Sequence, residues 1–73
     1  RIDILLLVSK NNGITVEGIT DKLNKNFKTV SEHTRRLVHA GLLNKQYHGR
    51  TVTHSLSPYG NKFLKFIETF QHS

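Results

Sequence analysis

The hydrophobic pattern of this 73-residue chain changes its period twice, and few folds accommodate that order. Up to Ala40 the apolar residues recur at helical spacing, in three segments separated by turns that contain Asn or Gly. Between Leu43 and Leu56 apolar and polar residues alternate on either side of Gly49, as in a β-hairpin. From Pro58 onward the helical spacing returns. The sequence therefore predicts three helices, a two-stranded hairpin and a fourth helix.

Short polar residues mark where the helices are expected to begin, because their side chains accept hydrogen bonds from backbone N–H groups that the first helical turn leaves free. The expected N-caps are Thr15, Asn26 and Ser57. Gly13 is expected to end the first helix in a left-handed conformation, and Ile14 is a candidate for a very short strand. The expected helices cover residues 2–9, 16–23, 26–40 and 58–71.

Two of these helices carry a distinct apolar face. On the third helix this face comprises Phe27, Val30, Thr34, Leu37 and Val38. On the last helix a narrow stripe comprises Tyr59, Phe63, Phe66, Ile67 and Phe70. This stripe holds more aromatic surface than the thin core of so small a domain needs.

Positive charge is concentrated in the middle of the chain. Eleven Lys and Arg against five Asp and Glu give a net charge of +6. The segment Lys25–Arg50 holds six bases and one acid, so it carries +5 of that charge. Many charged segments are only solvated surfaces, but an excess confined to one third of the chain favours a polyanionic partner.

The order of elements is the plan of a winged helix-turn-helix, in which two helices are joined by a short turn and a hairpin follows. The motifs that agree with this plan are Asn26-Phe27-Lys28-Thr29-Val30-Ser31 with His33 and Leu37, Ala40-Gly41-Leu42-Leu43, Gly49-Arg50 and Leu56-Ser57-Pro58-Tyr59-Gly60. In this order and spacing the chain resembles the ArsR/MarR-type winged-helix regulators, and most closely their short archaeal members. The resemblance covers Ile2 to Phe70.

The resemblance implies an α+β, mainly α, fold that forms a single winged helix-turn-helix DNA-binding domain over 1–73. It implies a recognition helix over about 26–40, a wing over about 43–57 centred on Gln46 to Thr53, a C-terminal helix over about 58–71, and a dimer interface formed by the terminal helices. Two features depart from the family pattern. Thr34 stands where Leu usually follows the histidine, and the cysteine-rich motif of the metal-responsive members is absent.

A recognition helix reads base edges in the major groove with its exposed face. With Val30 facing inward, the candidate contacts are Lys28, Thr29, Glu32, His33, Arg35 and Arg36. An arginine here would pair with guanine, and Thr29 with a thymine methyl group or a phosphate. Glu32 either accepts from cytosine or orients Arg36, four residues further on. On the wing the candidates are Lys45, His48, Arg50 and Thr51, unless these residues only keep the hairpin soluble.

The stripe on the last helix is interpreted as a homodimer interface formed by Phe63, Phe66, Ile67 and Phe70. A palindromic DNA site requires two-fold symmetry in the protein, which favours pairing with a second copy. The alternative is that the stripe covers the first helix within one molecule.

Several other classes of protein are not expected. Without Cys there is no disulfide framework, no thiolate zinc site and no cysteine catalysis. No two histidines stand at i, i+4 spacing, so neither a metal nor another cofactor is predicted. Protonation of the histidines near the basic segment below about pH 6.5 should instead raise the affinity for DNA. Without a nucleophile elbow, a phosphate-binding glycine loop or paired acids, we expect no enzyme.

The longest apolar run, Ile4–Val8, is too short for a membrane span or a signal peptide, so a cytoplasmic protein is expected. The first residue is Arg1 and not Met, which suggests a fragment of a longer chain. The predicted function is sequence-specific binding of double-stranded DNA by a transcriptional regulator that acts as a repressor. The alternatives are a protein-interaction winged helix within a larger transcription or replication assembly, whose surface should centre on exposed apolar residues, and binding of double-stranded RNA.

Overall fold

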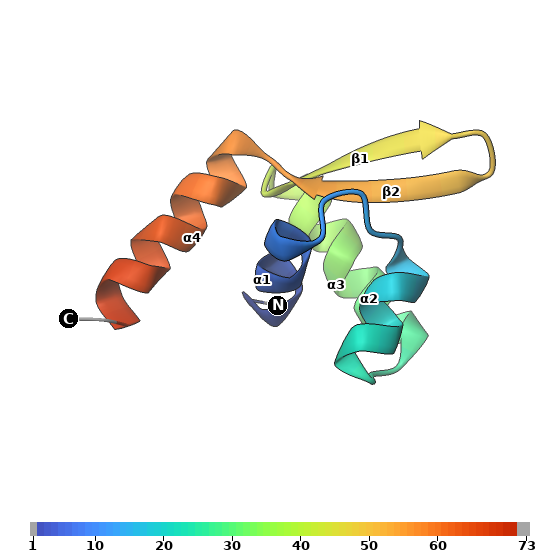
Figure 1. Cartoon of the computed structure of the whole chain (residues 1–73), viewed down its shortest axis with the longest axis horizontal. Coiled ribbons are helices and arrows are strands. Elements are labelled where there is room, and N and C mark those ends of the chain that lie inside the picture. Colours follow the sequence, from blue (N-terminus) through green and yellow to red (C-terminus); the bar gives the residue numbers. More distant parts are fainter. Residues whose placement is uncertain (1, 72–73) are drawn as a thin grey trace.

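Three helices and a β-hairpin form the body of the molecule, and a fourth helix extends from the base of the hairpin along one side (Figure 1). The computed structural model describes residues 2–71, and of Gln71 only the main chain. The elements in chain order are α1 (Ile2–Lys10), α2 (Val16–Leu23), α3 (Phe27–His39), β1 (Leu43–His48), β2 (Thr51–Leu56) and α4 (Pro58–Gln71). This order confirms the expected mainly helical α+β fold of the winged helix-turn-helix type.

The predicted caps fix where α2 and α3 begin. The Thr15 hydroxyl accepts a 3.1 Å hydrogen bond from the Gly18 N–H. The Asn26 side chain accepts from the N–H groups of Lys28 and Thr29, at 2.8 and 3.3 Å. Between them, Asn24 ends α2 in the left-handed conformation with φ of 53°. The turn between the two helices is therefore short and set by local side-chain bonds.

The hairpin, called the wing below, pairs β1 with β2 through a two-residue turn at Gly49 and Arg50. Gly49 has φ of +64°, which a glycine adopts without steric cost. Paired residues point to the same side of a sheet. The inner face of the wing, which turns toward the helices, carries the pairs Leu43–Leu56, Lys45–His54 and Tyr47–Val52.

A short bridge fastens the wing to the turn between α1 and α2. The His54 N–H donates to the Ile14 carbonyl, and the His54 carbonyl accepts from the Gly13 N–H, both at 2.8 Å. This is the very short strand expected at Ile14. Next to the bridge, the Asn12 side chain accepts a 3.2 Å hydrogen bond from the Leu56 N–H. The β2 side of the wing's base is thus held by two main-chain hydrogen bonds and one hydrogen bond to a side chain.

The core lies where α1, α2, α3 and the first residue of β1 converge. Its buried apolar side chains are Ile4, Leu5, Val8, Ile19, Val30, Leu37, Leu42, Leu43 and Leu64. Thr34 is buried among them at 1% exposure, and its hydroxyl donates to the Val30 carbonyl at 2.7 Å. The core at this position is polar and smaller than a leucine would make it, as the sequence indicated, and its hydroxyl is satisfied.

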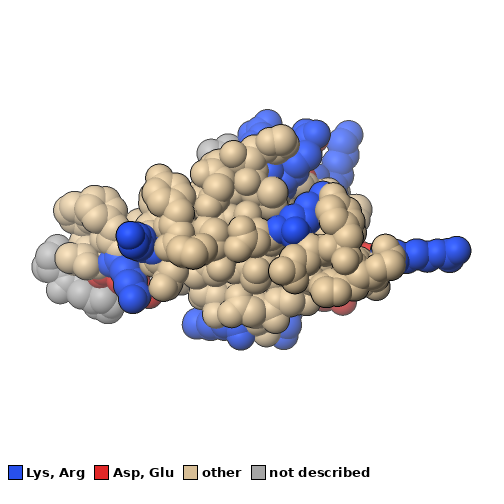
Figure 2. All heavy atoms as spheres, turned by 90° about the horizontal axis from the view of Figure 1, so that it is seen from above, with Lys and Arg blue, Asp and Glu red and all other residues tan. Residues whose placement is uncertain are grey.

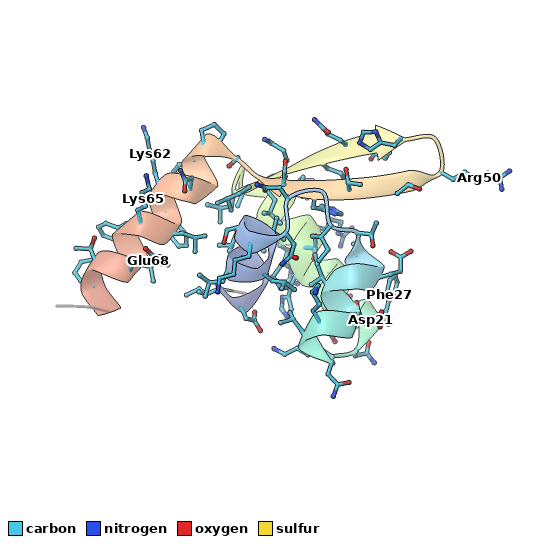
Figure 3. The ribbon with its side chains drawn as sticks, viewed as in Figure 1. Asp21, Phe27, Arg50, Lys62, Lys65 and Glu68 are labelled. Atoms are coloured by element: carbon cyan, nitrogen blue, oxygen red, sulfur yellow. The ribbon has the colours of Figure 1, made fainter. Side chains whose placement is uncertain are left out.

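Phe27 departs from the buried face predicted for α3, because its side chain is 52% exposed. It is the first residue of the helix, and the core lies one turn further on, at Val30. Phe27 therefore stands at the free end of α3 (Figure 3).

A serine and a glycine hold the first turn of α4 against the end of α3. The Ser57 hydroxyl donates to the Gly41 carbonyl at 2.6 Å and accepts from the Gly60 N–H at 2.9 Å, as the predicted N-cap. Gly60 is buried, and a β-carbon at this position would overlap the carbonyl oxygen of Leu42. The segment 56–60 thus fixes the direction in which α4 leaves the body.

The apolar stripe predicted on α4 divides between the body and solvent. Phe63 and Ile67 are half-buried. The stripe residues that remain exposed, by 60 to 64%, are Tyr59, Phe66 and Phe70. The body contacts α4 on one side, where Leu64, outside the predicted stripe, enters the core. Coverage of the first helix within one molecule therefore accounts for only part of the stripe.

Candidate nucleic-acid interface

The side of α3 that faces away from the core presents the charged and polar residues expected there. Val30, Thr34 and Leu37 bury the opposite side of the helix. The residues exposed on the outer side are Lys28, Thr29, Glu32, Arg35, Arg36 and His39. His33 lies at the flank of this surface and is half-buried. We call this set of residues, with His33, the outer face of α3.

Glu32 does not pair with Arg36 in this structure. Among the described residues, the salt bridge that forms joins Lys25 to Asp3, outside the outer face of α3. Arg36 is thus not held by Glu32. Both side chains remain available to a ligand, and Glu32 offers an acceptor in an otherwise basic surface.

The four wing residues predicted from the sequence do not share one surface. Lys45 lies on the inner face, opposite His54. His48 and Thr51 form the last pair of the hairpin on the outer face. Arg50 occupies the tip, where its side chain extends away from the body (Figure 3). A contact through the tip would engage Arg50, while Lys45 faces the groove beside α3.

Tyr47 is a candidate that the sequence-based prediction missed. Its side chain is 70% exposed on the inner face of the wing. The Lys45 Nζ lies 5.4 Å from the centre of the Tyr47 ring, a cation–π distance. The alternation of β1 already places Tyr47 on the same face as Lys45, so the signal was present in the sequence. An exposed aromatic ring beside a lysine is suited to contact with sugar and phosphate.

A groove of about 370 Å³ separates α3 and the start of α2 from the inner face of the wing. Arg35 and His39 line it from α3, Lys45 lines it from β1, and Glu17 is the acid among its lining residues. Phe27 stands at the same groove. The groove therefore joins the two surfaces that carry the predicted contacts, and its charge is mainly positive.

His54 lies deep in this groove. Its side chain is 3% exposed, and the buried Nδ1 atom has no hydrogen-bond partner. Burial lowers the pKa of the His54 imidazole, and the charge of Lys45 lowers that pKa further, while the Ile14 backbone partly opposes both. The neutral imidazole is therefore the form that this environment favours.

Positive charge is distributed over several parts of the surface. In the view from above (Figure 2), Lys and Arg side chains lie along the rim, within the face, and far out at the wing end, while few acid side chains appear on this face. Such a distribution attracts a polyanion from several directions. Arg35 and Lys45 line one groove, whereas Arg50 extends away from the body at the tip of the wing.

The part of the chain that the structure describes has neither a metal site nor a membrane-spanning helix. Within residues 2–71, no three His, Asp or Glu side chains gather closely enough to hold a metal ion. Over the same residues, no helix combines the length and the apolar character that crossing a membrane requires.

Comparison with known proteins places the chain among regulators. A family model described as bacterial regulatory protein, arsR family, matches residues 1–45. No curated protein matches the chain. Its fold is similar to that of MarR, with a TM-score of 0.88 and 16% identity over 97% of this chain and 54% of MarR. The chain thus spans about half the length of MarR.

Two further solved structures have the same fold. AF1382 from Archaeoglobus fulgidus has a TM-score of 0.82 at 20% identity, over 97% of this chain and 82% of that one. A predicted DNA-binding transcriptional regulator from E. coli has the same score and identity, over 96% of this chain and 75% of that one. Because the archaeal and the bacterial structure agree equally well, closeness to archaeal members stays a prediction.

Proposed function

Because the chain belongs to the arsR family of bacterial regulatory proteins, we propose that it binds double-stranded DNA sequence-specifically, as a homodimer that represses transcription by occupying its site. It would do so in the cytoplasm and without catalysis. The outer face of α3 would enter the major groove, and the wing would contact the backbone or the adjacent minor groove.

The observation that carries this proposal is the division of α3 into two sides. One side is buried through Val30, Thr34 and Leu37, and the other exposes three bases, Lys28, Arg35 and Arg36, with a single acid. A helix that is exposed along a whole basic side fits the width of the major groove. The bases supply phosphate contacts, and the arginines and Thr29 can read base edges.

The wing extends this surface. Arg50 reaches out from the tip, and arginine is the side chain favoured in a narrow, strongly negative minor groove. Lys45 and Tyr47, on the inner face, would contact the sugar–phosphate backbone between the two grooves. His48 and Thr51, on the outer face, would then contribute less than the sequence alone suggested.

Exposed aromatic residues on α4 support the homodimer. Phe66 and Phe70 are 61 and 64% exposed, and their rings contact each other edge to face at 4.8 Å. Ile2 and Leu6 on α1, the neighbouring helix, are also partly exposed, by 42 and 36%. Two neighbouring helices thus both expose apolar side chains, which is typical of an interface. A two-fold pairing here would present two copies of α3 to the half-sites of a palindrome.

The experiment is selection of bound duplexes from a random-sequence library, followed by affinity measurements over a salt series. We expect a palindromic motif, and an affinity whose logarithm falls linearly with the logarithm of salt concentration. Arg35→Gln with Arg36→Gln should abolish recovery of the motif. Lys62→Gln with Lys65→Gln removes the same charge from α4 and should retain it.

Weak binding without a motif, equal in both double variants, would contradict the proposal. The interaction module considered from the sequence would then be favoured, with the apolar surface of α4 and α1 as its contact.

A further inference from the structure

His54 stands where three parts of the fold meet. Its main chain forms the bridge to Gly13 and Ile14, so it fastens the wing to the turn between α1 and α2. Its side chain points to the inner face of the wing and lines the groove beside α3. Any change that displaces the main chain of His54 must therefore also move the base of the wing.

The buried imidazole is suited to its position only while it is neutral. A neutral ring has one nitrogen that carries a lone pair and needs no acceptor, whereas an imidazolium has N–H donors on both nitrogens. Nδ1 of His54 is buried and has no partner among the described residues. Protonation would thus place a charge and a donor without an acceptor in an interior where only 3% of the residue is exposed.

The charged groups around His54 also oppose a proton there. Lys45 faces it across the strands, on β1. From α3, Arg35 and His39 line the same groove, and from α2 Glu17 is the acid that offsets them in part. The α1–α2 turn contributes the Ile14 backbone, whose effect favours the proton. Bases outnumber acids in this environment, so the surroundings do not compensate an added charge.

We propose that His54 is a proton-triggered latch of the wing: on protonation its imidazole leaves the inner face, and the bridge to Gly13 and Ile14 opens. The latch is closed at neutral pH and opens as the pH falls below about 6.5, the usual range of a histidine. The sign follows from linkage, since a histidine that is held neutral by the folded state stabilises that state above this range and destabilises it below.

The effect on DNA binding, which rests on the proposed function, is opposite to that of the exposed histidines. Positive charge gained by the exposed surface in acid strengthens DNA binding. Opening of the latch frees the wing and weakens the contacts made by Lys45 and Arg50. The protein would therefore bind DNA less tightly in acid than its surface charge alone predicts.

The test is an NMR titration of the whole chain from pH 7.5 downward, which follows the histidine rings and the scalar couplings across two hydrogen bonds. These bonds run from the Gly13 N–H to the His54 carbonyl and from the His54 N–H to the Ile14 carbonyl. We expect both couplings to vanish in the step in which His54 takes its proton. His54→Gln, which cannot be protonated, should keep them, and His48→Gln should lose them at the same pH as the original chain.

Couplings that persist while His54 becomes protonated would overturn the latch, as would their loss in His54→Gln at the same pH. Should His54→Gln not fold, the titration of the original chain decides alone. DNA affinity is the second measurement. As the pH is lowered, the ratio of the affinity of the original chain to that of His54→Gln should decrease. The decrease is at most about tenfold per pH unit for one linked proton. A flat ratio would overturn the coupling to DNA, whereas no duplex binding by either protein would refute the proposed function and leave the latch intact.

Discussion

The Nζ atom of Lys25 lies 2.8 Å from Oδ2 of Asp3, and this ion pair ties α1 to the turn that precedes α3. The hydrogen bond from Lys25 holds the pKa of the Asp3 carboxyl well below its usual range. The two side chains remain 54 and 39% exposed, so solvent screens their attraction. The pair thus links α1 to the turn before α3, and we expect its contribution to stability to be small.

A double-mutant cycle with Asp3→Asn and Lys25→Gln should give a coupling free energy of unfolding below about 1 kcal/mol, as is usual for exposed pairs. Because folding lowers the pKa of Asp3, the contribution is present above about pH 4 and is lost as the pH falls further. Urea unfolding at pH 7 and pH 3 measures both. A coupling that is as large at pH 3 as at pH 7 would show that the two residues interact by packing instead of charge.

Gly60→Ala should destabilise the fold by about 1–3 kcal/mol, the range for overpacking a filled site. The added β-carbon would overlap the Leu42 carbonyl oxygen, which belongs to the main chain and cannot move aside as a side chain would. Asn61→Ala, at the next and exposed position, is the matched control and should stay within about 0.5 kcal/mol. Equal unfolding midpoints for the two variants would mean that α4 packs less closely than the structure has it.

Arg36→Ala should cost about 1–3 kcal/mol at the selected DNA site and relax the preference at one base pair. Lys28→Ala should instead weaken binding to all sequences alike and lower the salt slope by about one. Competition binding against single-base variants of the site distinguishes the two patterns. A uniform loss for Arg36→Ala would identify Arg36 as a phosphate contact.

Phe70→Asp should dissociate the proposed dimer, because it places a carboxylate in the exposed apolar stripe of α4, where Phe70 is 64% exposed. Asn61→Asp introduces the same group on another side of α4 and should leave the assembly unchanged. Sedimentation at micromolar concentration measures the mass of each. An unchanged mass for Phe70→Asp would remove α4 from the interface.

The local structure was predictable because short-range chemistry determines it. Thr15, Asn26 and Ser57 accept hydrogen bonds from the N–H groups of their own helices, so each helix start could be read from a few neighbouring residues. The alternation of β1 and β2 likewise determined the hairpin and its turn.

Burial was less predictable, since it depends on elements distant in the sequence. Phe27 has the right periodicity for the core but stands beyond its edge. The sequence indicated a short strand at Ile14, but it did not identify the partner, His54, which lies forty residues later and is buried. In the wing, by contrast, the alternation of β1 already places Lys45 and His48 on opposite faces of the hairpin, so this difference was predictable from the sequence.

The close approach of Gly60 to Leu42 also makes α4 a lever arm with a rigid pivot. The helix comprises 14 residues, which is about 21 Å at 1.5 Å per residue. A small rotation at the pivot is thus magnified at the far end, where Phe66 and Phe70 would meet the second copy. In such a dimer, the absence of a side chain at Gly60 would determine the angle at which α4 leaves the body. That angle would set the distance between the two copies of α3, and hence the spacing of half-sites that the protein can span.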